Sequence, residues 1–126
     1  RLWKKQEAVQ EHLHRLIEEK DMIEIKFKPD TFTLDITGHA EHGEKGEDIV
    51  CAAISTLFYT LAESLYAMKE YTESLDIDDT DGYGHIVCKA KEKYEANISL
   101  IYWTILTGFE IVAKHYEKNV NLTVVG

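Results

Sequence analysis

Cys51 is the residue of this sequence whose chemistry is most readily turned to catalysis. We expect a helix to start at Asp48, a residue type that commonly caps helices, which places Cys51 in the first turn. Unpaired N–H groups and the helix dipole favour the thiolate there, and the thiolate is the nucleophilic form of cysteine. The neighbouring Ile49, Val50 and Ala52 also suit a small side chain that only packs in a core. Cys51 alone therefore leaves both interpretations open.

A catalytic cysteine needs a base within hydrogen-bonding reach, and His39 is the candidate. It lies twelve residues before Cys51, on a polar loop over residues 37–47 that contains three glycines. A loop that leaves a strand and returns into a helix start can carry an imidazole over a thiol at that start. His42 is the rival base, or alternatively a substrate contact. Each histidine is also explained as a surface residue without a role.

Three further groups near Cys51 are assigned weaker, supporting roles. Ser55 follows Cys51 by four residues and shares its helix face. It orients the thiol or a substrate carbonyl, or it bonds back to its own helix backbone. The backbone N–H groups of Cys51 and Ala52 are candidates for an oxyanion hole. Asp48 is first of all a cap, and only secondly a group that orients His39.

The second cysteine gives no sign of chemistry. Cys88 alternates with Ile86 and Ala90, as a core residue of a strand does, and two thiols do not suggest a disulfide framework. The groups from which a zinc site is conceivable are Cys51, His39, His42 and His85. Their spacings match no known ligand pattern, so we expect neither a metal nor another cofactor.

The 126-residue chain has a net charge of −9, and that charge is unevenly distributed. Residues 1–21 are balanced, whereas residues 22–126 hold 18 acidic and 9 basic side chains. Such a surface repels phosphate backbones, so we expect no direct nucleic-acid partner. It attracts basic proteins or peptides, although simple solubility also explains it. No uninterrupted apolar run approaches roughly 18 residues and no signal peptide is recognised, which predicts a cytoplasmic protein without a membrane partner.

Hydrophobic periodicity predicts an α+β fold, with two long helices packed on a mostly antiparallel sheet. Alternation of apolar and polar residues predicts two hairpins and one final strand. In chain order the elements are strands 22–28 and 32–36, a helix over 48–71, strands 75–77 and 86–90, a helix over 95–116, and a strand over 121–125. The predicted order is therefore β-β-α-β-β-α-β.

The two ends of the chain carry further expectations. Residues 6–20 have the periodicity of an amphipathic helix, and Met22 looks like a translation start. We therefore divide the chain into a helical extension over 1–21, either native or added, and a single domain over 22–126. The helix over 95–116 is apolar around much of its circumference, which predicts a homodimer that covers the excess. Burial of this helix within a monomer is the competing explanation.

Two motifs make the sequence resemble a known family. Gly38-His39-Ala40 is followed, after five residues, by the run from Gly46 to Ser55 that reads GEDIVCAAIS. Spacing and content are similar to those of the ribosomal-processing cysteine protease family, Prp, and the likeness extends from Met22 to the end of the chain. Many members have Gly-Tyr where this chain has Glu41-His42, which changes charge and shape in the loop. Residues 1–21 have no counterpart.

The resemblance implies a homodimeric α+β cysteine protease that removes the N-terminal extension of a large-subunit ribosomal protein. By motif match, Cys51 is the nucleophile and His39 the general base, and the loop from Gly38 to Gly46 orders over substrate. One alternative is a non-catalytic dimeric module that binds ribosomal protein or ribosome assembly intermediates. Another is a redox sensor that uses Cys51 without His39.

Overall fold

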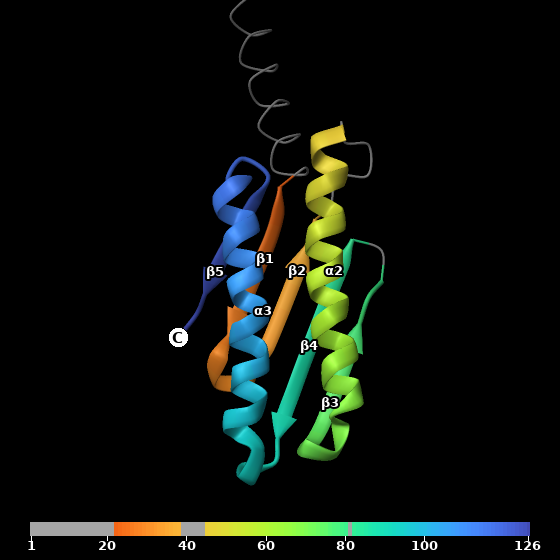
Figure 1. Ribbon diagram of the computed structural model, residues 1–126, viewed down its shortest axis with the longest axis vertical. Helices are drawn as coiled ribbons and strands as arrows, with labels where there is room; N and C mark the ends of the chain where they lie inside the picture. Colours follow the sequence, from red (N-terminus) through yellow and green to blue (C-terminus); the bar gives the residue numbers. More distant parts are fainter. Residues whose placement is uncertain (1–21, 39–44, 81) are drawn as a thin grey trace, which may run out of the picture.

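The computed structural model describes residues 22–38, 45–80 and 82–126, except for the side chains of residues 45–48. The helix predicted over residues 6–20 lies outside this part of the chain, as do His39 and His42. The described residues form one sheet and one layer of helices (Figure 1).

The described residues form five strands, which are β1 (Ile23–Lys28), β2 (Thr33–Thr37), β3 (Thr72–Asp78), β4 (Tyr83–Ala90) and β5 (Val120–Val124). They make a single sheet with the order β3-β4-β2-β1-β5. β1 and β5 are parallel, and every other neighbouring pair is antiparallel. Both predicted hairpins are therefore confirmed, one between β1 and β2 and one between β3 and β4.

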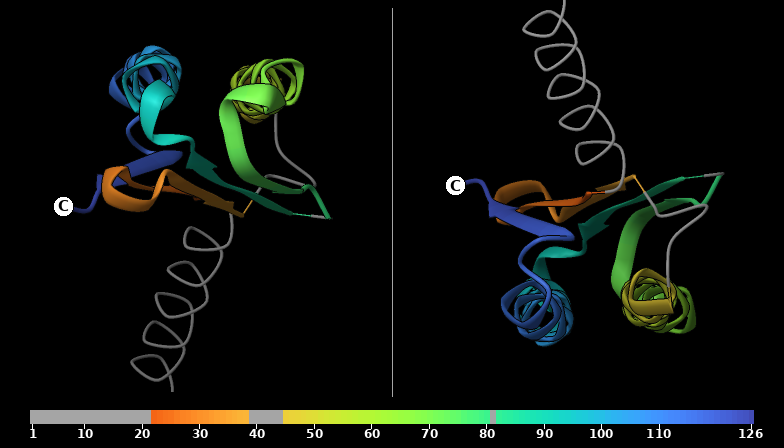
Figure 2. Two further views of the ribbon diagram at one scale, coloured as in Figure 1. Left: turned by 90° about the horizontal axis from the view of Figure 1, so that it is seen from below. Right: turned by 90° about the horizontal axis from the view of Figure 1, so that it is seen from above.

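Two long helices, α2 (Lys45–Ala67) and α3 (Glu95–His115), cover the same face of the sheet (Figure 2). Alternate strand residues point towards them, so that Ile23, Ile25 and Phe27 of β1 are buried while the residues between are exposed. Three short 3₁₀ turns connect these elements: η1 (Pro29–Thr31), η2 (Lys69–Tyr71) and η3 (Glu92–Tyr94). The α+β prediction is confirmed, with one sheet face packed and the other polar.

The start of α2 differs from the sequence prediction. The helix begins at Lys45, so Asp48 lies inside its first turns and is not the cap. Acidic residues stabilise a helix N-terminus from within the first turn, and Lys and Glu are good helix formers, so the helical segment extends further upstream. At its other end α2 stops at Ala67, and the chain continues through η2 to Tyr71.

Both helices reach the length and apolar composition of a membrane span, over Ile49–Ala67 and Glu92–His115. Polar residues interrupt both spans, so they do not contradict the expectation that no uninterrupted apolar run is this long. Both helices also pack one face on the sheet, as core helices do, with Leu61 of α2 and Phe109 of α3 fully buried. Length and composition alone do not distinguish a membrane-spanning helix from a core helix.

Candidate active site

A cavity of about 220 Å³ lies beside Cys51, between the first half of α2 and the sheet. Residues of α2 form one wall, and the turn between β3 and β4 forms another. Ile23 and Ile36 reach it from the neighbouring strands β1 and β2. Cys51 is a free, partly buried thiol on the cavity wall, so a molecule in the cavity can reach its sulfur.

The α2 wall combines reactive, polar and apolar side chains in a regular pattern. Cys51, Ser55 and Tyr59 recur at intervals of four residues, so they line one helix face. Phe58 contributes an apolar side to the cavity. A Cβ atom at Gly84 of β4 would lie 2.9 Å from the Phe58 ring, so the glycine allows that ring to approach β4 closely.

The wall opposite α2 is the turn between β3 and β4. The Tyr59 hydroxyl donates a hydrogen bond to Oδ2 of Asp79 over 3.0 Å, which joins α2 to this turn. The hydrogen bond to Asp79, together with desolvation, raises the pKa of Tyr59. The next N–H, that of Thr80, donates to Asp78 at 3.2 Å. Sequence reasoning identified this segment only as a turn, because no local signal connects residues 20 positions apart.

Gly38 marks where the chain leaves β2 towards the loop that carries His39. Its φ is +82°, and an added Cβ would lie 2.5 Å from the carbonyl oxygen of Met22. The Gly38 N–H donates to the carbonyl of Gly82 in the β3–β4 turn over 3.1 Å. Only glycine fits this position, where three segments of backbone meet at the cavity.

The structure brings together three of the predicted site residues. Cys51, Ser55 and Gly38 all line the cavity, whereas Ala52 is exposed and does not. Asp48 and Gly46 belong to α2, which begins at Lys45 and not at Asp48.

The position of Cys51 in α2 also needs a correction. Because α2 begins at Lys45, Cys51 lies in the second turn and not in the first. The effect of a helix dipole falls off within one turn, so activation of the thiol depends less on the helix than predicted.

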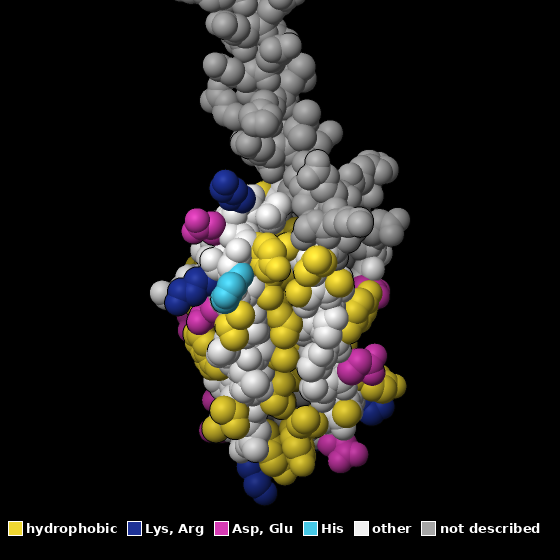
Figure 3. All heavy atoms as spheres, turned by 45° about the horizontal axis from the view of Figure 1, so that its top comes forward, with side chains coloured by type: hydrophobic (Ala, Val, Ile, Leu, Met, Phe, Trp, Pro, Cys, Tyr) yellow, Lys and Arg dark blue, Asp and Glu magenta, His cyan; other side chains and the backbone are white. Residues whose placement is uncertain are grey.

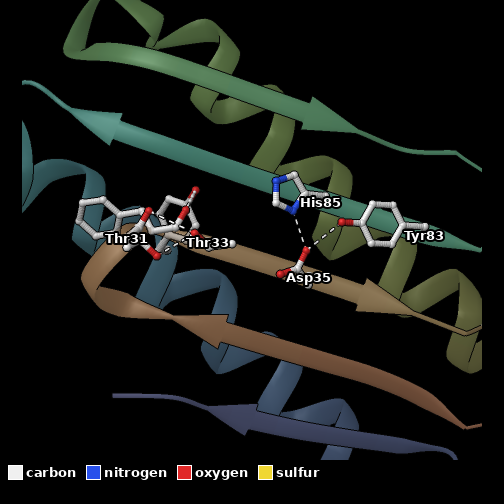
Figure 4. Close-up of polar contacts among 7 residues, drawn as sticks. Thr31, Thr33, Asp35, Tyr83 and His85 are labelled. Carbon is white, nitrogen blue, oxygen red and sulfur yellow. Dashed lines mark hydrogen bonds and ion pairs between the residues drawn. The ribbon is translucent and has the colours of Figure 1, made fainter.

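His85 lies apart from this site, on the opposite face of the sheet. Its Nδ1 is 2.6 Å from Oδ1 of Asp35, and the Tyr83 hydroxyl donates to the same oxygen over 3.2 Å (Figure 4). Gly84, the next residue of β4, faces Phe58 on the helix side, so His85 points away from Cys51. Among the described residues no three potential ligands lie close enough to hold a metal ion. Cys51 and His85, two of the residues considered for a zinc site, therefore lie on opposite sides of the sheet.

Cys88 lies in the core, as predicted. It is 2% exposed, and burial raises the pKa of its thiol to about 11. A thiol with that pKa stays protonated, and therefore weakly nucleophilic, at neutral pH. Of the two cysteines, only Cys51 is both accessible and next to a cavity.

Comparison with known proteins adds the decisive observation. The family model described as Cysteine protease Prp matches residues 22–121, which are most of the chain. The chain belongs to the Prp family of cysteine proteases.

Individual Prp proteins give the same result. The ribosomal processing cysteine protease Prp of Staphylococcus aureus strain Mu50 is 32% identical over 85 residues, covering 68% of this chain and 78% of the relative. A crystal structure of an essential S. aureus Prp with a covalently linked product peptide has a TM-score of 0.64 at 26% identity, covering 82% of this chain and 100% of that one. A second S. aureus Prp structure, with a substrate peptide, has a TM-score of 0.62 at 25% identity, covering 82% and 98%.

Proposed function

We propose that this cysteine protease removes an N-terminal extension from a large-subunit ribosomal protein, with Cys51 as nucleophile and His39 as general base. The observation that carries the proposal is the partly buried Cys51 thiol beside a cavity, in a chain of the Prp family. Relatives named ribosomal processing proteases, one of them solved with a substrate peptide and one with a linked product peptide, support a peptide substrate. The acidic balance of residues 22–126 suits a basic ribosomal protein.

The proposed reaction proceeds in two steps. His39 accepts the proton of the Cys51 thiol as the sulfur attacks the scissile carbonyl, and the carbonyl oxygen becomes an oxyanion. Collapse of this intermediate breaks the C–N bond, and the imidazolium returns the proton to the leaving amine. Water then attacks the thioester, with His39 again as base, and releases the carboxylate product and the free thiol.

The test of this proposal is cleavage of the extended ribosomal protein from the same source. We expect the parent protein to cut one bond near the N-terminus, seen on a gel and located by mass spectrometry. His39→Ala should lower the rate by about 10²–10⁴-fold, the usual contribution of a general base. His42→Ala is the matched control, and we expect it to retain most activity.

Three outcomes discriminate between the candidate functions. Loss of activity in His42→Ala, with activity retained in His39→Ala, would show that His42 and not His39 is the general base. Tight binding without cleavage by the parent protein would support the non-catalytic module. Neither binding nor cleavage would show that the substrate is wrong.

We also infer that two copies of the chain associate through the helix layer. Apolar side chains gather along the helices in the view of Figure 3. On α3, Leu100 and Ile111 are 69% and 56% exposed, and Trp103 is exposed as well. Contiguous exposed apolar surface of this kind typically marks an interface.

Sedimentation velocity tests the dimer directly. We expect the parent protein to have the mass of two chains, and Leu100→Glu to shift it towards one. Thr123→Glu introduces the same charge at an exposed position on β5 and is expected to leave the dimer intact. A monomeric parent protein at micromolar concentration would refute the inference.

A further inference from the structure

Tyr59, which holds Asp79, lies about two helical turns beyond Cys51 on α2. Cys51 and Tyr59 are eight residues apart on α2, which corresponds to about 12 Å along a helix axis. An extended peptide advances about 3.3 Å per residue. A substrate strand lying along α2 from Cys51 would therefore reach Tyr59 with its third or fourth residue from the scissile bond.

The surface between Cys51 and the Tyr59–Asp79 pair changes from apolar to acidic. Ile54 and Phe58 supply an apolar surface, and Asp79 places a carboxylate beyond it. A carboxylate offers about four lone-pair sites, and the Tyr59 hydroxyl uses one of them. Tyr59 donates this bond over 3.0 Å and so fixes the position of the Asp79 carboxylate.

A side chain that matches this surface has an apolar stem and a donor head group. Lysine and arginine have that structure, because their methylene stems pack on apolar surface while the charged group reaches a polar partner. Neither a lysine nor an arginine is found among the described residues that line the cavity, so no neighbouring cation there competes for Asp79. Asp78 lies next to Asp79 and adds negative potential.

We propose that Asp79, positioned by Tyr59, binds a lysine or arginine side chain of the substrate three or four residues from the scissile bond. This assignment rests on the proposed function, since it needs a peptide in the cavity. It makes Asp79 a specificity residue and Tyr59 a positioning residue. The apolar wall contributes affinity, and the carboxylate determines which residue type is preferred.

Binding of peptides to the inactive Cys51→Ala variant measures the preference for a basic residue separately from cleavage. The probes are peptides spanning the junction between extension and mature protein, with lysine placed at each position in turn and a matched set carrying uncharged norleucine. We expect lysine to bind about tenfold more tightly than norleucine at one position three or four residues from the junction bond. Adding Asp79→Asn should remove that difference, and Tyr59→Phe should reduce it.

Asp76→Asn is the matched control, because it removes the same charge from an exposed position on β3, outside the cavity. We expect it to retain the preference for lysine. A glutamate at the same peptide position should bind worse than norleucine in the Cys51→Ala background, which tests the proposal even if Asp79→Asn fails to fold.

The outcomes separate this proposal from the proposed function. Equal or undetectable binding of the lysine and norleucine peptides at every position would refute the role of Asp79. An equal loss of preference in Asp76→Asn would also refute it, because the effect would then be one of overall charge. Absence of cleavage by the parent protein, with lysine-dependent binding intact, would refute the proposed function alone.

Discussion

Cys51→Ala should lower kcat/KM for peptide cleavage by at least about 10⁴-fold, because covalent catalysis has no substitute once its nucleophile is gone. The variant should still bind substrate, since the alanine removes only one sulfur from the cavity wall. Progress curves with one junction peptide measure the rate, and equilibrium binding of the same peptide measures affinity. Unchanged cleavage in Cys51→Ala would place the nucleophile elsewhere.

The matched control for this experiment is Cys88→Ala, which we expect to retain activity. Cys88 is buried in the core, and its raised pKa of about 11 keeps it a neutral thiol. Iodoacetamide at neutral pH should accordingly modify Cys51 and leave Cys88 untouched in the folded protein, as read by peptide mass spectrometry. Rapid modification of Cys88 in the folded protein would contradict this description of the core.

Gly38→Ala is expected to destabilise the protein by about 2–4 kcal/mol, through backbone strain at positive φ and a forced shift at a close contact. A Cβ at Gly38 would lie 2.5 Å from the Met22 carbonyl oxygen, so the start of β1 or the end of β2 must move. Because Gly38 immediately precedes His39, we also expect a loss of kcat. Thermal unfolding should show a Tm lower by roughly 8 °C or more.

Gly126→Ala provides the comparison for this effect. Its Cβ would meet only Pro29, at the ordinary contact distance of 3.9 Å, so we expect a change within about 0.5 kcal/mol. A Gly38→Ala protein as stable as the parent would mean that the strands at this junction adjust freely. Normal stability with reduced kcat would instead assign Gly38 to the site alone.

Much of the fold was predictable because strands and helices have different hydrophobic periods. The alternation in Ile23, Ile25 and Phe27 indicated which face of β1 is buried, and the helix stripes indicated α2 and α3. The start of α2 was not predictable in the same way, because Asp48 suits both a cap and a first-turn position.

The site was predictable only in part, for a related reason. Cys51 and Gly38 stand in motifs of neighbouring residues, which a sequence displays directly. The contact between Tyr59 and Asp79 depends on how a helix and a hairpin turn meet in space, and neither residue belongs to a motif. The pairing of His85 with Asp35 likewise follows from the register of β4 on β2. The roles of His39 and His42 stay predictions.

The parallel pairing of β1 with β5 affects how the protein reaches its native state during synthesis. It joins Glu24 to Asn121, which are 97 positions apart, so the inner strand β1 lacks one neighbour until β5 has been made. Non-local pairing of this kind is slow, and an unpaired strand edge is prone to aggregation in the meantime. We therefore expect a nascent chain that ends before Val120 to remain incompletely folded and without protease activity. Synthesis of β5 would then be what first allows the enzyme to act.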